Sequence, residues 1–236
     1  MNRESHITSV LGVIPARGGS KGIAHKNLAL VAGRPLLAYT ADAARASQRL
    51  TRVIVSTDDP AIADAARALD LDVPFLRPPE LATDTTPMLP VVQHAVDAMS
   101  ANGFTADAVV LLQPTSPLRR AEHIDRAVEL LDSSGADSVV AVTEVPHQFN
   151  PVSVMRLDGD RLVPFLDGPQ VYRRQDKPLV FARNGPAVVA TRVDVLRHGS
   201  LYGDDSRPLV MTPEESLDID SQSDLERLEY LLARRQ

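Results

Sequence analysis

The stretch Val10-Leu-Gly-Val-Ile-Pro-Ala-Arg-Gly-Gly-Ser-Lys-Gly-Ile-Ala-His-Lys-Asn27 decides the fold of this chain. Its first five residues are apolar and predict a buried strand. Pro15 ends that strand because proline offers no N–H to a β-ladder. The residues after Pro15 predict a loop whose backbone can turn sharply and approach a ligand with no Cβ in the way, because they include Gly18, Gly19 and Gly22.

Three cations surround this loop, namely Arg17, Lys21 and Lys26. The chain has only three lysines against 22 arginines, and two of the lysines lie here. A lysine is a mobile point charge that suits a phosphate, and arginine does not simply replace it. The alternative is an ordinary glycine-rich turn with solvated charges. We predict a phosphate-binding loop, although neither G-x-x-x-x-G-K-[ST] nor G-x-G-x-x-G is present.

The composition predicts one soluble domain over residues 1–236, which is a length ample for a core. The net charge is −6 with no basic block, so a nucleic-acid surface is not expected. The absence of cysteine excludes disulfides, thiolate metal sites and cysteine nucleophiles. No apolar run approaches the roughly 18 residues of a membrane span, and no signal-peptide pattern opens the chain. We therefore expect a cytoplasmic protein with no membrane partner.

Strand and helix patterns alternate five times between residues 10 and 143. Strands are predicted at 10–14, 52–57, 72–76, 108–113 and 137–143, and helices at about 36–46, 61–69, 87–99 and 122–131. This alternation predicts an α/β fold, a Rossmann-like, mostly parallel sheet with helices on both faces. Ligands of such sheets bind at the carboxyl ends of the strands. The glycine-rich loop, Ser56–Asp58 and Gln113–Ser116 are all predicted there.

The pattern changes between residues 144 and 180, a segment that we call the arm. Two short apolar stretches flank Asp158-Gly159 and predict a hairpin. The arm is too thin for its own core and too apolar for a free linker, so we expect it to pack on a second subunit through Val152, Val154 and Phe165. A strand at 188–191, a short helix from Asp194, an edge strand at 209–211 and a helix at 223–233 complete the prediction.

Three further groups of residues have the chemistry of a site. Asp218 and Asp220 share one face of an extended segment, so both reach one hard cation such as Mg²⁺. The alternative is an acidic loop in which Asp220 or Ser221 caps the last helix. Uncharged hydrogen-bonding groups lie at the end of the strand at 108–113 and just after it, namely Gln113, Thr115 and Ser116. The alternative is that they only cap a turn. Arg173, Arg174 and Arg183 form a second cationic set, or a solvated surface, and we assign Asp58 and Asp59 to helix capping.

The glycine-rich string Ile14-Pro-Ala-Arg-Gly-Gly-Ser-Lys-Gly22, closed by Lys26-Asn27, resembles the signature of the CMP-acylneuraminate synthetases, also called acylneuraminate cytidylyltransferases. Leu111-Leu-Gln-Pro-Thr-Ser-Pro-Leu-Arg119 and Arg77-Pro-Pro-Glu-Leu-Ala-Thr-Asp84 are similar to two further signatures of that family. Weaker similarities occur at Arg173-Arg-Gln-Asp176, Asn184-Gly185 and Ser216–Asp220. The matches keep the family's order from about Val10 to Leu225.

The resemblance implies a Mg²⁺-dependent enzyme that joins CTP to an acidic sugar, with Arg17, Lys21 and Asp220 as catalytic residues. Arg17 and Lys21 would grip the CTP phosphates, with Asn27 and Arg77 near the cytosine. The implied nucleotide-binding set is Ala16, Arg17, Gly18, Gly19, Ser20, Lys21, Lys26, Asn27, Arg77, Thr83 and Asp84. The implied acceptor-binding set is Gln113, Thr115, Ser116, Arg174, Gln175 and Arg183, and the implied metal ligands are Asp218 and Asp220. The arm would cross to a partner subunit in a homodimer whose sites use residues of both chains.

The chain departs from the family's pattern on the acceptor side, at Ala182 and Pro186, and on the cytosine side, at the pair Pro87-Met88. We therefore predict transfer of CMP to an acidic, sialic-acid-like nonulosonic acid other than N-acetylneuraminic acid itself. The alternatives are a phosphonate or another small acid as acceptor and, more remotely, a nucleotide-binding homologue without catalysis. In each active case an acceptor oxygen attacks the α-phosphorus of CTP and pyrophosphate leaves.

Overall fold

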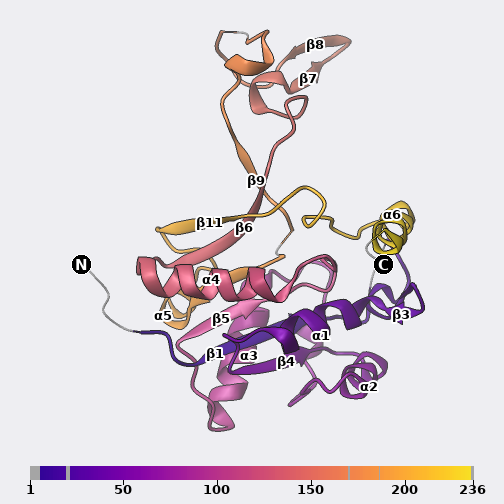
Figure 1. The fold of residues 1–236 in the computed structure, drawn as a ribbon, viewed down its shortest axis with the longest axis vertical. Coiled ribbons are helices and arrows are strands. Elements are labelled where there is room, and N and C mark those ends of the chain that lie inside the picture. Colours follow the sequence, from indigo (N-terminus) through magenta and orange to yellow (C-terminus); the bar gives the residue numbers. More distant parts are fainter. Residues whose placement is uncertain (1–5, 20–21, 170, 186, 235–236) are drawn as a thin grey trace.

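The computed structural model describes residues 6–19, 22–169, 171–185 and 187–234. A central sheet has the strand order β11-β6-β10-β5-β1-β4, and β9 also pairs with β6 (Figure 1). The neighbours run parallel except at β10 and β9, which are antiparallel to the strands beside them. The strands are β1 (Val10–Pro15), β4 (Arg52–Ser56), β5 (Ala108–Leu111), β6 (Ser138–Glu144), β9 (Phe181–Arg183), β10 (Val189–Arg192) and β11 (Ser206–Val210).

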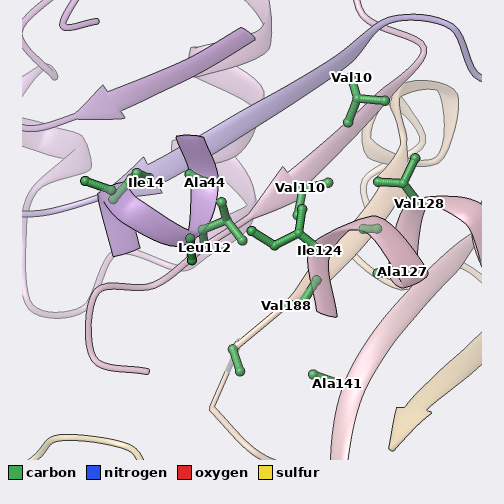
Figure 2. Packing of buried hydrophobic residues seen from close by; sticks show 14 of the residues in the cluster. Val10, Ile14, Ala44, Val110, Leu112, Ile124, Ala127, Val128, Ala141 and Val188 are labelled. Atoms are coloured by element: carbon green, nitrogen blue, oxygen red, sulfur yellow. The ribbon is translucent and has the colours of Figure 1, made fainter. Parts of the chain in front are cut away.

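Helices cover both faces of this sheet, as predicted. Alternate residues of β1 explain this, because Val10 and Ile14 belong to one buried cluster while Leu11 and Val13 belong to another. The first cluster receives α1, α2 and α4, and Figure 2 shows Ile124 and Val128 of α4 within it. The second receives α3 and α5. The helices are α1 (Leu36–Ala46), α2 (Pro60–Ala68), α3 (Met88–Ala101), α4 (Ala121–Ser134), α5 (Val193–Arg197) and α6 (Gln222–Ala233).

Short elements complete the chain between these helices and strands. Two small ribbons are formed by β2 (Leu30–Val31) with β3 (Arg34–Pro35) and by β7 (Met155–Asp158) with β8 (Arg161–Pro164). Single 3₁₀ turns are η1 (Lys26–Leu28), η2 (Pro79–Leu81), η3 (Pro151–Ser153) and η4 (Arg174–Asp176). No helix within the described ranges is long and apolar enough to cross a membrane.

One predicted strand, residues 72–76, is wrong. The segment touches the sheet at only two isolated bridges, from Asp72 to Ile54 and from Leu76 to Thr57. Pro74 lies between them and has no N–H to donate, so a continuous ladder cannot form there. The other strands and helices of the alternating region form where predicted, with shifts of one to three residues at their ends.

The arm projects away from the sheet, from the end of β6 to the start of β9 (Figure 1). Its predicted hairpin is confirmed, with β7 and β8 paired so that Asp158 lies opposite Arg161. Gly159 takes a φ of 63° in the turn, a conformation that favours glycine. None of the described apolar side chains between residues 145 and 180 is buried, and Phe165 is 59% exposed. Its large exposed side chains are Phe149, Met155, Leu157, Leu162, Phe165, Leu166, Tyr172 and Leu179.

We expect the start of α2 to depend on Asp59. Its carboxylate accepts hydrogen bonds from the N–H groups of Ala61 (2.8 Å) and Ile62 (3.4 Å). Asp59→Ala should therefore lower the free energy of unfolding by about 1 kcal/mol in a denaturant titration. The control is Asp64→Ala on the same helix, where only a surface pair with Arg67 is lost and the change should stay below about 0.5 kcal/mol. Equal losses in the two variants would contradict the capping role.

Candidate functional site

A cleft of about 360 Å³ lies at the carboxyl ends of β1 and β5. Its position is explained by the parallel strands, because their carboxyl ends meet at one edge of the sheet. Eight of the residues predicted from the sequence line it together, which are Arg17, Lys26, Asn27, Arg77, Gln113, Thr115, Asp218 and Asp220. The other lining residues are Pro15, Gly22, Met88 and Pro114.

The glycine-rich loop rests on the junction between β4 and α2. Ala16 is buried and donates its N–H to the Ser56 carbonyl (3.0 Å). The Gly18 N–H donates to Asp58 Oδ1 (3.1 Å), so Asp58 orders the loop rather than capping α2. A Cβ on Gly18 would lie 2.5 Å from the Asp59 carboxylate, which explains the glycine, whereas Gly19 faces open space. The predicted loop residues Ser20 and Lys21 lie outside the described residues.

Arg17 extends from this loop to Asp84, in the loop that follows η2. Its Nη1 lies 2.8 Å from Asp84 Oδ1, and both side chains are about one-third exposed. The backbone of Arg17 is fixed as well, because Asn27 Nδ2 donates to its carbonyl (3.0 Å). Thr83, another predicted nucleotide contact, hydrogen-bonds to Thr86 within its own loop and does not line the cleft.

Arg77 brings a buried positive charge to the cleft. Its side chain donates from Nε to Ser56 Oγ (3.0 Å) and from Nη2 to the Ser56 carbonyl. Burial is the main cause that lowers the pKa of Arg77, to about 10, while the negative charge of Asp58 raises it and Arg17 lowers it. The guanidinium stays protonated at neutral pH and is available to an anion or a polar ring.

The two predicted metal ligands face the same cleft but differ in their surroundings. Burial raises the pKa of Asp218, with Asp220 acting in the same direction and Thr115 and Lys26 against it. Asp218 Oδ1 is buried and has no hydrogen-bond partner in the described part of the chain. The Asp220 side chain is 78% exposed and accepts from Lys26 Nζ (3.1 Å).

This donor set fits a divalent cation such as Mg²⁺. A buried carboxylate oxygen without a partner among the described residues, beside a second carboxylate, is the kind of ligand pair that the ion prefers. Of the two residues that the alternative named as caps of the last helix, Ser221 is the N-cap of α6, where it forms a capping box with Asp224, and Asp220 is not. Among the described residues no group of three or more histidine, aspartate or glutamate side chains could hold a metal ion.

The loop after β5 forms a further wall of the cleft. Gln113 and Thr115 line it, and Thr115 Oγ1 donates to Gln113 Oε1 (3.4 Å). The Thr115 carbonyl accepts from the N–H of Ile219 (2.8 Å), which joins this loop to the segment of the two aspartates. Ser116 is fully buried and does not line the cleft, and its Oγ has no partner among the described residues.

Besides Ser116, three residues predicted to bind the acceptor do not lie in the cleft of their own chain. Arg174 and Gln175 belong to η4 in the arm, and Arg174 lines a separate hollow beside His147 and Lys177. Arg183 lies at the base of the arm, where its guanidinium stacks 4.7 Å from the centre of the Tyr202 ring.

The sequence patterns did not indicate every residue of the cleft. Pro15, Met88 and Pro114 line it, and none of the three has a charged side chain or a strong hydrogen-bonding group. The available signal was position, since Pro15 and Pro114 lie at the ends of the two buried strands and Met88 opens α3. No role was assigned to buried Arg119 from the sequence, because a single arginine at the end of a loop gives no sign of its surroundings.

A family model described as cytidylyltransferase matches residues 11–236. The chain belongs to this cytidylyltransferase family. It is therefore a nucleotidyltransferase enzyme, and the match covers every residue that lines the cleft.

Curated relatives place the chain more closely within the family. It is 36% identical over 231 residues to a CMP-N,N'-diacetyllegionaminic acid synthase of Legionella pneumophila, which covers 96% of this chain and 97% of the relative. It is 33% identical to an N-acylneuraminate cytidylyltransferase of Escherichia coli, over 93% of this chain and 51% of the relative. The chain thus spans nearly all of the first relative and about half of the second.

The fold is shared with more distant cytidylyltransferases. A solved structure of CMP:2-keto-3-deoxy-manno-octonic acid synthetase, complexed with CTP, superposes with a TM-score of 0.72 at 19% identity. The superposition covers 97% of this chain and all of the other. This supports the Rossmann-like assignment of the sheet and its helices.

We expect Gly185 to be needed for the position of Asp218. Gly185 has a φ of 57°, and a Cβ there would lie 2.7 Å from the Asp218 carboxylate. Gly185→Ala should displace that carboxylate and lower the rate of pyrophosphate release at least about tenfold, the equivalent of 1.4 kcal/mol.

The matched control is Gly103→Ala, where φ is 81° but no atom lies within 4 Å of the added Cβ. Both variants lose about 1 kcal/mol of stability through the left-handed backbone. Only Gly185→Ala should lose turnover per folded molecule. Equal turnover in the two variants would show that the position of Asp218 does not depend on the missing Cβ.

Proposed function

We propose that this cytidylyltransferase transfers CMP from CTP to an acidic, sialic-acid-like nonulosonic acid and releases pyrophosphate. The observation that carries the proposal is the cleft itself, where Arg17, Lys26 and Arg77 face the carboxylates of Asp218 and Asp220. Cations suit a triphosphate, and paired carboxylates suit the ion that accompanies it. The names of the relatives point to the same reaction class.

The nucleotide end of the cleft is assigned to the glycine-rich loop and its neighbours. Arg17 and Lys21 would bind the phosphates, and Arg17 would then exchange Asp84 for a phosphate oxygen. Asn27 and Arg77 would lie beside the base, because both are buried and line the cleft next to Arg17. The remaining nucleotide contacts of this proposal are Ala16, Gly18, Gly19, Ser20, Lys26, Thr83 and Asp84.

The reaction asks the protein mainly for positioning and charge. An acceptor hydroxyl oxygen attacks the α-phosphorus in line, the bond to the bridging oxygen breaks, and pyrophosphate leaves with both electrons of that bond. The hydroxyl proton passes to solvent or to the exposed carboxylate of Asp220. Arg17 and Lys21 offset the charge that develops on the leaving group.

Asp218 and Asp220 would hold Mg²⁺, with the buried oxygen of Asp218 as one ligand. When bound, the ion supplies a positive charge that neutralises the phosphates. Lys26 would give up its contact with Asp220 when the ion binds there, because its ammonium lies against both Asp220 and the Ile219 carbonyl. Its remaining bond to Ile219 keeps it beside the phosphates.

The acceptor would contact Gln113 and Thr115 of one chain and the arm of another. Arg174 and Gln175 lie in an arm that projects from the sheet, and the described apolar side chains of that arm have no buried position within its own chain. A homodimer would cover these side chains and bring Arg174 to the neighbouring cleft, where a guanidinium suits a carboxylate. Cytoplasmic location stays a prediction from composition.

The test of the proposed function is an acceptor screen with the purified protein, CTP and Mg²⁺. Pyrophosphate release and CMP-linked products are measured with N-acetylneuraminic, legionaminic and pseudaminic acids and with simple phosphonates. We expect the highest kcat/KM with a nonulosonic acid other than N-acetylneuraminic acid. A preference for phosphonates would replace the proposed acceptor, and turnover with none of these acids would refute the function.

Replacement of the exposed metal ligand should separate metal use from folding. Asp220→Asn removes one carboxylate charge, so we expect the Mg²⁺ concentration for half-maximal activity to rise and turnover to fall about 10-fold to 100-fold. Asp70→Asn is the control, because Asp70 is an exposed aspartate that does not line the cleft. Activity of the unmodified protein after removal of divalent ions would contradict the metal assignment.

A shared site can be tested by complementation between two inactive variants. Arg174→Ala inactivates the arm of one chain, and Asp220→Asn inactivates the cleft of the other. A mixed dimer therefore retains one complete site, made by the intact cleft of the first chain and the intact arm of the second. Random pairing makes half of the dimers mixed, and one of their two sites works, which predicts about one-quarter of normal activity. Mixed dimers with no recovered activity, or a fully active monomer in sedimentation, would show that the arm serves its own chain.

A further inference from the structure

Arg119 is a buried arginine directly behind the wall of the cleft. It is 3% exposed and belongs to the segment that joins the loop after β5 to α4. Its Nη1 donates to the carbonyls of Gln113 (3.1 Å) and Ala187 (2.7 Å), and its Nη2 donates to Thr40 Oγ1 on α1 (2.6 Å). One guanidinium therefore holds three separate segments of the chain.

The charge of Arg119 has no acidic partner among the described residues. None of their carboxylates lies within ion-pair distance of it, and its Nε has no hydrogen-bond partner in the same part of the chain. Burial alone lowers its pKa, to about 9, so the group is charged at neutral pH in a place where charge is unfavourable. An apolar side chain in its place would leave the carbonyls of Gln113 and Ala187 without this donor. These hydrogen bonds are therefore what a buried arginine offers here, and they connect segments that lie at the cleft.

The two carbonyls that share Nη1 belong to two segments that lead to the site. Gln113 begins the loop that lines the cleft, and Thr115 of that loop accepts from Ile219 between the two aspartates. Ala187 donates its N–H to the Gly185 carbonyl (2.5 Å), and a Cβ on Gly185 would lie 2.7 Å from the Asp218 carboxylate. A movement of Arg119 would change the spacing between Gln113 and Asp218.

We propose that Arg119 is a positioning residue that fixes the loop at Gln113–Thr115 relative to the turn at Gly185. The planar guanidinium donates to both carbonyls from Nη1, while its Nη2 is anchored to α1 through Thr40. Its effect on turnover rests on the proposed function, in which Gln113 contacts the acceptor and Asp218 binds the metal ion. The residue itself touches neither substrate.

The first test needs no substrate. Hydrogen exchange is measured in the full-length protein for the unmodified chain, Arg119→Lys, Arg119→Met and the surface control Arg126→Met. We expect both Arg119 variants to lose protection at least tenfold in peptides covering 112–116 and 187–190. Peptides covering 10–16 should exchange as before, because Arg119 makes no hydrogen bond to that strand. Unchanged protection at 112–116 in a folded variant overturns the proposal.

Thr40→Val keeps the test falsifiable if the Arg119 variants fail to fold. It removes one acceptor of the guanidinium, and Thr40 itself does not line the cleft. It should lower protection of the same two regions by about threefold to tenfold, a smaller change than loss of the whole guanidinium. The same exchange pattern as in the unmodified protein would overturn the proposal.

Kinetics distinguish positioning from a structural role. We expect Arg119→Lys to lower kcat tenfold or more and raise the KM of the acceptor, while CTP affinity changes less than threefold. A structural role would lower only the fraction of folded enzyme, so both KM values would stay normal. Full rescue by lysine would show that charge alone matters and would overturn the positioning role. If the unmodified protein uses no acceptor, the proposed function fails, and hydrogen exchange still decides the role of Arg119.

Discussion

The parallel pairing of β1 between β4 and β5 is the constraint on which the rest of the site depends. It places the ends of three strands at one edge, so the glycine-rich loop meets Asp58 after β4 and lies near Gln113 after β5. The antiparallel direction of β10 adds to this arrangement. Because β10 runs the other way, its start lies at the same edge as the ends of its neighbours, and Gly185 reaches Asp218 there.

The cleft already contains the charges that a nucleotide would rearrange. Arg17 holds Asp84 and Lys26 holds Asp220, so in this state each of these cations faces a carboxylate rather than water alone. Such pairs keep the cations oriented, although partly exposed pairs contribute little to stability. In the proposed function a polyanion would compete for Arg17 and Lys26, and a divalent ion would compete for Asp220. Nucleotide and metal are thus expected to favour each other's binding.

Much of this fold could be predicted because its signals are local. The apolar run of β1, the glycines after it and the alternating helices are read from short patterns, and the hairpin of the arm from Asp158-Gly159. Features that depend on distant segments could not be predicted in this way. Pro74 prevents a ladder that the apolar pattern favoured, and β10 runs antiparallel to its neighbours. Arg183 stacks on Tyr202, outside the cleft. The burial of Arg119 likewise depends on α1 and the start of β10.

The place where the arm joins the sheet has a consequence for how such chains diversify. It leaves from the end of β6 and returns through β9, which pairs with β6 from Val142 to Glu144, so its two ends are held side by side. The closure entropy of an insertion grows only slowly with its length, by about 0.6 kcal/mol for each doubling. The arm can therefore lengthen, shorten or be exchanged for another while the register of the sheet stays the same. The sheet and the nucleotide end of the cleft can then stay the same while the arm changes.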